Sequence, residues 1–160
     1  MEFTLDSSLR LYCYSLPARK EDMESLLLKY PELPGGYEDL TVQATGTVFL
    51  WNEKGQLRIW GPEEALAMNA AYNVDEYAPG ALAFADNGAG EILLYGTGLS
   101  GLGVYIVETG SIALDSDAAW VSRDLNGILL RADGAELIFQ SDPVDESEIT
   151  EPFLIESELR

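Results

Sequence analysis

The sequence contains no histidine and only one cysteine, Cys13. Without histidine the chain lacks the usual base for a serine or cysteine nucleophile and the commonest zinc ligand. One cysteine cannot form an internal disulfide or a cysteine metal cluster. These absences point to no catalytic residue, no metal and no cofactor, although they do not by themselves exclude an active site.

Long hydrophobic runs are also missing. No stretch approaches the roughly 20 apolar residues that cross a bilayer. The first six residues have neither the basic start nor the apolar core of a secretory signal. The expectation is a soluble, cytoplasmic protein without a membrane partner.

Basic residues are scarce. The 160-residue chain has 9 lysines and arginines against 28 acids, a net charge of −19. Such a surface repels nucleic acid, nucleotide phosphates and anionic membranes. We therefore expect no nucleic-acid partner, and a basic protein as the favoured one.

Residues 59–122 contain no basic side chain at all. Two interpretations stay open: a solubilising acidic surface, or a docking face for a basic protein with aromatic anchors. In the second, Tyr72 and Tyr77 are candidate anchors, and Trp60 is either an anchor or core. The candidate partner-binding residues are Glu63, Glu64, Tyr72, Asp75, Glu76, Tyr77, Asp86, Glu91, Glu108, Asp115 and Asp117.

Hydrophobic periodicity in the first half predicts strands and helices in succession. Alternation at residues 9–14 predicts a strand, and apolar spacing from 23 to 30 predicts a helix that ends at Pro31. A short helix is expected after Gly36, and a hairpin at 47–51 and 56–60 with a four-residue link. A further helix should begin at Pro62, with the inward stripe Ala65, Met68 and Tyr72.

The second half predicts an antiparallel meander. Its short apolar runs, separated by glycine-rich turns, lie at residues 81–84, 92–95, 104–107, 112–114 and 118–121. Asp124 then resembles the N-cap of a helix, with a hairpin turning at Asp133 and Gly134 as the alternative. Residues 136–140 could add a last strand.

These elements together predict a single α+β domain over residues 1–140. A mostly antiparallel, curved sheet should be flanked by N-terminal and C-terminal helices. Residues 141–160 hold seven acids and one base and predict a mobile acidic tail. Its apolar residues 153–155 could dock on the domain or serve a partner.

Two patterns imitate ligand sites. Residues 96–101 fit G-x-G-x-x-G, but a strand follows where a dinucleotide site needs a helix, so a hairpin turn is favoured. The acidic turns at 86–91 and 115–117 offer oxygen ligands for a hard cation. Solvated turn residues are the favoured interpretation there.

The order of several segments is similar to a known family. These segments are Leu33 and Pro34 with Tyr37 and Leu40, Gly46 before a hairpin, the glycine-rich stretch 84–91, the strand 104–107, and the helix within 121–129. They resemble the SUKH superfamily, bacterial immunity proteins and eukaryotic cell-wall-synthesis regulators. The resemblance implies a non-enzymatic binding protein, most often one that neutralises a toxin. Many such toxins are nucleases, which are basic.

Three hypotheses follow for the function. The first is an intracellular immunity-type protein that occludes a basic, nuclease-like toxin domain through its acidic face. The second is a regulatory or scaffold interaction domain without a toxin. The third is an enzyme or ligand-binding domain that uses acidic residues and a metal.

Overall fold

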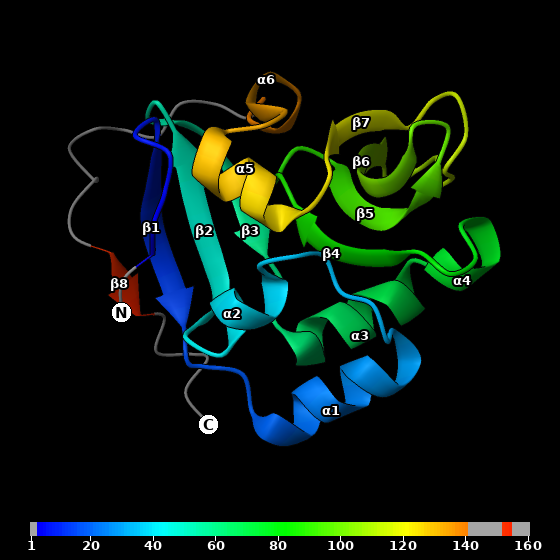
Figure 1. The fold of residues 1–160 in the computed structure, drawn as a ribbon, viewed down its shortest axis with the longest axis horizontal. Coiled ribbons are helices and arrows are strands. Elements are labelled where there is room, and N and C mark those ends of the chain that lie inside the picture. Colours follow the sequence, from blue (N-terminus) through cyan, green and yellow to red (C-terminus); the bar gives the residue numbers. More distant parts are fainter. Residues whose placement is uncertain (1–2, 141–151, 155–160) are drawn as a thin grey trace.

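A computed structural model describes residues 3–140 and 152–154. One curved sheet runs through the molecule in the order β7-β6-β5-β4-β3-β2-β1-β8 (Figure 1). Neighbouring strands are antiparallel, except that β8 is parallel to β1. The strands are β1 (Leu9–Ser15), β2 (Thr45–Trp51), β3 (Lys54–Ile59), β4 (Leu82–Asp86), β5 (Glu91–Gly98), β6 (Gly101–Glu108), β7 (Ala119–Ser122) and β8 (Phe153–Leu154).

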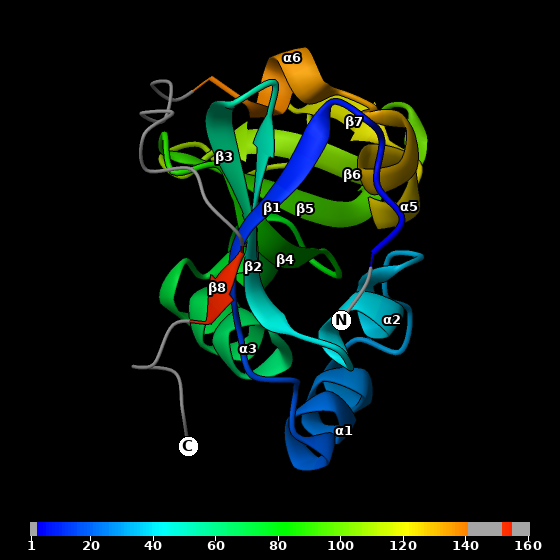
Figure 2. The same cartoon turned by 90° about the vertical axis from the view of Figure 1, so that its left-hand side faces the viewer.

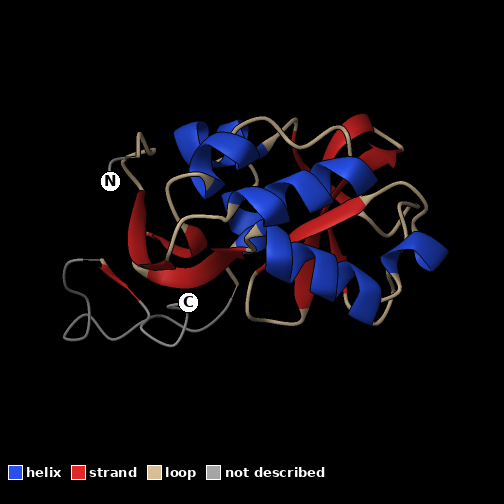
Figure 3. Cartoon of the chain, turned by 90° about the horizontal axis from the view of Figure 1, so that it is seen from below, coloured by secondary structure: helices blue, strands red, loops and turns tan. Residues whose placement is uncertain are grey.

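Six helices in the described residues complete the single α+β domain. They are α1 (Lys20–Lys29), α2 (Tyr37–Thr41), α3 (Pro62–Ala71), α4 (Val74–Tyr77), α5 (Leu125–Arg131) and α6 (Ala135–Ile138). Helices α1 and α6 lie at opposite ends of the molecule (Figures 1 and 2). Seen from the α1 end, helices cover the strands (Figure 3). Within the described ranges no helix is long and apolar enough to cross a membrane.

Several predicted elements follow directly from local chemistry. The β2–β3 hairpin turns at Asn52 and Glu53, whose φ angles of 49° and 60° match the primed turns that suit a twisted hairpin. The turn is shorter than the predicted link, because β3 already begins at Lys54. The Asp124 carboxylate accepts the Gly127 N–H at 2.9 Å. This cap selects helix α5 over the alternative hairpin.

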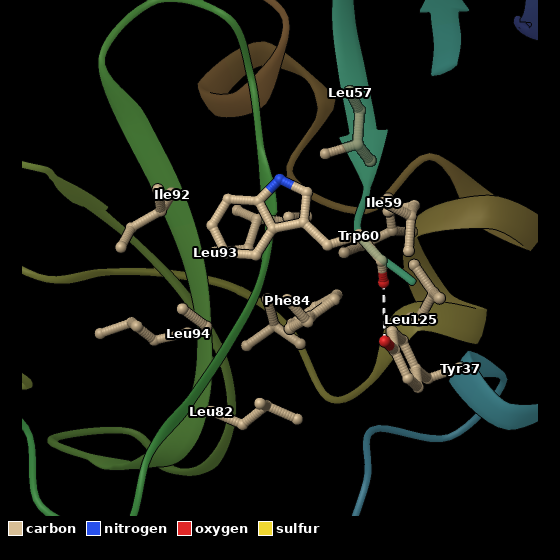
Figure 4. Packing of buried hydrophobic residues seen from close by; sticks show 14 of the residues in the cluster. Tyr37, Leu57, Ile59, Trp60, Leu82, Phe84, Ile92, Leu93, Leu94 and Leu125 are labelled. Atoms are coloured by element: carbon tan, nitrogen blue, oxygen red, sulfur yellow. Dashed lines mark hydrogen bonds between the residues drawn. The ribbon is translucent and has the colours of Figure 1, made fainter. Parts of the chain in front are cut away.

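The core is centred on Trp60, which is completely buried (Figure 4). The Tyr37 hydroxyl donates to the Trp60 carbonyl oxygen at 2.6 Å, and the Trp60 indole donates to the Asp86 carboxylate at 2.7 Å. Burial raises the pKa of Tyr37 far above its usual value. Trp60 is therefore a core residue and not an exposed partner anchor.

Asn69 on α3 is a buried polar residue that the predicted inward stripe left out. Its amide Nδ2 donates to the Ala83 carbonyl at 2.8 Å, and its Oδ1 accepts the Ala83 N–H at 3.0 Å. Strand β3 pairs with β4 only at Asp86 and Ala85. Beyond the end of β3, the Asn69 side chain thus supplies the hydrogen bonds to β4 that a neighbouring strand would otherwise make.

Two predicted strands are wrong. Residues 112–114 form a loop, in which Ile112 is buried without strand pairing, because β7 already occupies the edge of β6. Within residues 136–140 the chain forms the single helical turn α6, which begins after Gly134 at φ 68°. An apolar run of this length satisfies either structure, so the local pattern does not decide between them.

The C-terminal segment is described only in part. Phe153 and Leu154 dock on β1, opposite Cys13 and Tyr14, and the Phe153 ring lies edge-on to Tyr12 at 5.4 Å. Ile155 and the predicted mobility of the acidic tail lie outside the described residues.

Candidate functional site

Most described basic residues are already paired with acids of the same chain. Their ion pairs are Arg10–Glu53, Arg19–Asp22, Arg19–Glu63, Lys20–Glu24, Lys29–Asp75, Arg58–Glu64 and Arg131–Asp133. The few cations are therefore largely used within the fold. An acidic group that lacks such a partner is the more available for an external cation.

The candidate residues on α3 and α4 form one group. Glu63 and Glu64 lie in the first turn of α3, where the helix dipole favours acids. Glu64 is held by Arg58 at 2.6 Å, and Asp75 by Lys29 at 3.1 Å. The hydrogen bond to Asp75 also raises the pKa of Lys29. These pairs partly neutralise the group.

The aromatic candidates of this group differ in exposure. Tyr77 is 55% exposed and lies next to exposed Glu76, whereas Tyr72 is half-buried against the core. Only Tyr77 of the two presents most of its ring to solvent. This group therefore offers a single strong aromatic contact.

Asp86 ends β4 and lies opposite Arg58 of β3. Its carboxylate accepts the Trp60 indole and the Gly88 N–H at 3.0 Å. The residue shapes the β4–β5 turn and orients the core tryptophan. We therefore assign it a structural role.

Three other candidates, Glu91, Glu108 and Asp117, line one pocket of about 380 Å³ at the ends of β5 and β6. We call it the acidic pocket. Its remaining lining consists of Ile106, Val107, Ser111, Ala119, Leu137 and Gln140. Among the described residues that line it there is no lysine or arginine. The pocket thus combines apolar side chains with three carboxylates, and its described lining contains no cation.

The sheet register brings two of these carboxylates together. Glu91 and Glu108 are directly opposed across β5 and β6, an arrangement of like charges that weakens a strand pair. Glu91 accepts a hydrogen bond from the Asn87 amide at 2.9 Å, and the same amide donates to the Ile138 carbonyl at 2.9 Å. Buried Asn87 thereby connects the pocket carboxylate to α6.

Asp115 and Asp117 lie on the loop between β6 and β7. The Asp117 N–H donates to the Asp115 carboxylate at 2.9 Å, and both side chains are exposed. In the part of the chain that the structure describes, no group of three or more acidic or cysteine side chains could hold a metal ion.

The sequence did not identify the residues that complete this site. Leu137 lies in α6 and Gln140 lies two residues after its end, where a strand was expected, and Asn87 was noted only as part of an acidic turn. Trp120 on β7, 38% exposed, was not among the candidate anchors. Its position shortly after the acidic turn 115–117 was the signal that the sequence offered.

Comparison with known proteins adds no further assignment. The sequence matches no family model and no curated protein.

Proposed function

We propose that the chain is an immunity-type binding protein that occludes a basic toxin domain through the acidic pocket. The observation that carries this proposal is that some candidate acids are paired with basic side chains of the same chain and others are not. On α3 and α4, Glu63, Glu64 and Asp75 have internal cations, whereas Glu91, Glu108 and Asp117 share a pocket whose described lining has none. The SUKH resemblance of the sequence agrees with a binding role.

The pocket suits lysine or arginine side chains of a protein surface. Their aliphatic stems can pack on Ile106, Ala119 and Leu137 while the charged end reaches the carboxylates. The opposition of Glu91 and Glu108 is unfavourable in the free protein. A bound cation relieves that repulsion, so part of the binding free energy comes from the pocket's own strain.

Neutralising the pocket should weaken the complex. The test partner is a secreted toxin found encoded beside the gene of this chain, with the toxin activity disabled for purification; if no such gene lies there, the proposed function loses its partner. The triple variant E91Q/E108Q/D117N should bind this toxin at least about tenfold more weakly than the wild type, because buried charge pairs at interfaces are costly to remove. Surface plasmon resonance measures the affinity, and growth of host cells that express active toxin measures protection.

A matched control separates the pocket from net charge. E21Q/E38Q/D39N removes three exposed acids from α1 and α2, far from α6 (Figure 2). It should bind nearly as tightly as the wild type. Equal losses of affinity in the two triple variants would show that binding depends only on the overall net charge and not on the pocket. Absence of both a complex and protection would refute the proposed function.

Association with the toxin should depend strongly on salt. Long-range attraction raises the on-rate of oppositely charged proteins by ~10–10³-fold, and salt screens it beyond about 8–10 Å. Between 20 and 150 mM salt, stopped-flow association should therefore slow by about tenfold or more, with a much smaller change in the off-rate. An on-rate that does not respond to salt would show that the acidic surface serves only solubility.

A further inference from the structure

The two edges of the sheet differ in their strand pairing. At one edge, Phe153 and Leu154 of β8 pair with Cys13 and Tyr14 of β1. At the other edge, no strand among residues 3–140 and 152–154 pairs with the outer side of β7. An unpaired edge offers backbone N–H and C=O groups to another chain. Within the described part of the chain the β7 edge is therefore unpaired, and through Ala119 it borders the acidic pocket.

The accessible part of β7 is its first half. Gly134 lies so close to Val121 that an added Cβ would meet the Val121 backbone, which shields the second half. Ala119 and Trp120 remain, opposite Ile106 and Tyr105 of β6. A two-residue pairing already suffices for β8 at the other edge.

Ala119 and Trp120 face opposite sides of the sheet, as successive strand residues do. Ala119 lines the acidic pocket together with its partner Ile106. Trp120 lies on the other face, edge-on to the Tyr105 ring with 5.4 Å between ring centroids. A segment along this edge would meet carboxylates on one face and an aromatic ring on the other.

The Trp120 ring is held in position before any partner arrives. A Cβ at Gly103 would collide with it, so the ring lies directly on that backbone. The Tyr105 hydroxyl in turn donates to the Gly101 carbonyl at 2.6 Å and accepts the Ser100 N–H at 3.0 Å. Contacts with a fixed aromatic side chain cost little conformational entropy.

We propose that the outer edge of β7 accepts an extended segment of the basic partner as an additional short strand. Residues of this segment alternate in character. Basic residues face the acidic pocket, and the apolar residues between them contact Trp120. This inference rests on the proposed function and adds the conformation and the sequence pattern of the bound segment. The pocket carboxylates specify the basic residues by charge complementarity, and main-chain hydrogen bonds to β7 supply affinity.

Short peptides test the pattern directly. The probe is the blocked pentapeptide Lys-Val-Lys-Val-Lys, and its matched control Lys-Lys-Lys-Val-Val has the same composition and charge without alternation. Titration of the full chain at low salt should show the alternating peptide binding at least about tenfold more tightly, with a change in Trp120 fluorescence. N-methylation of the peptide edge that faces β7 should abolish this preference, whereas N-methylation of the opposite edge should not.

Variants of the chain locate the contact. Trp120→Leu keeps an apolar strand residue but removes the ring, and should weaken binding of the alternating peptide and remove the fluorescence change. The control L99A/L102A truncates two exposed side chains of the β5–β6 hairpin and should leave binding unchanged. Hydrogen exchange should show slower exchange of the β7 amides when the peptide is bound.

The outcomes separate this inference from the proposed function. If both peptides bind equally and E91Q/E108Q/D117N weakens both, the acidic pocket binds cations but no strand is added, and the inference is wrong. If the triple variant changes the binding of neither the peptides nor the toxin, the proposed function fails as well. Unchanged peptide binding by Trp120→Leu would refute the role of the ring.

Discussion

Replacing Asn69 by alanine is expected to lower the free energy of unfolding by about 4 kcal/mol. The variant would leave the Ala83 N–H and C=O without their side-chain partners inside the core. Each buried polar group without a hydrogen bond costs about 1–3 kcal/mol. Since a domain of this size is stable by only about 5–15 kcal/mol, the variant should be close to unfolding at physiological temperature.

Urea denaturation followed by circular dichroism measures this loss. The matched control is Ala67→Asn, which places the same side chain on the exposed face of α3. It should cost less than about 1 kcal/mol, because only helix propensity changes. If Asn69→Ala and Ala67→Asn had similar midpoints, the Asn69 contacts would contribute no more than an exposed polar side chain.

Replacing Gly55 by alanine should have the next largest effect, about 3 kcal/mol. Gly55 has φ 56°, a conformation that costs an L-residue about 1–2 kcal/mol. An added Cβ would also lie 2.9 Å from the Phe139 backbone, at the end of α6. Such overpacking costs a further amount of about 1–3 kcal/mol. The displaced end of α6 would carry Leu137 and Gln140 away from the acidic pocket.

Gly90 provides the control for this substitution. Its φ is 84°, but an added Cβ would meet no atom within 4 Å. Gly90→Ala should therefore show the conformational cost alone, and Gly55→Ala should be less stable in thermal and urea denaturation. On the proposed function, Gly55→Ala should also bind the toxin less well. Equal stability of the two variants would contradict the close packing of α6 on the β2–β3 hairpin.

Local patterns predicted the elements whose signals are contained within one segment. The apolar spacing of Met23 and Leu26, both buried, identified α1, and the Asp124 cap identified the start of α5. The predicted strand at residues 112–114 was wrong because Ile112 is buried by a loop that packs on the core. Asn69 was missed because its partner, Ala83, belongs to a different element.

The acidic pocket depends on contacts between separate elements, which the sequence of any one segment does not reveal. Glu91 meets Glu108 only through the β5–β6 register, and Leu137 reaches them only because α6 packs against the sheet. The acidic stretch 59–122 contains all three pocket carboxylates, but it also includes Glu64 and Asp75. Their ion pairs with Arg58 and Lys29, which lie outside that stretch, could be found only from the fold.

The strand order has a consequence for synthesis of the protein. From β1 to β7, each strand lies beside the next one in the chain. The sheet can therefore grow strand by strand as the polypeptide leaves the ribosome, without waiting for a distant segment. At each stage the newest strand carries the open edge. Only when translation reaches residues 153–154 can the oldest edge, that of β1, receive its cover.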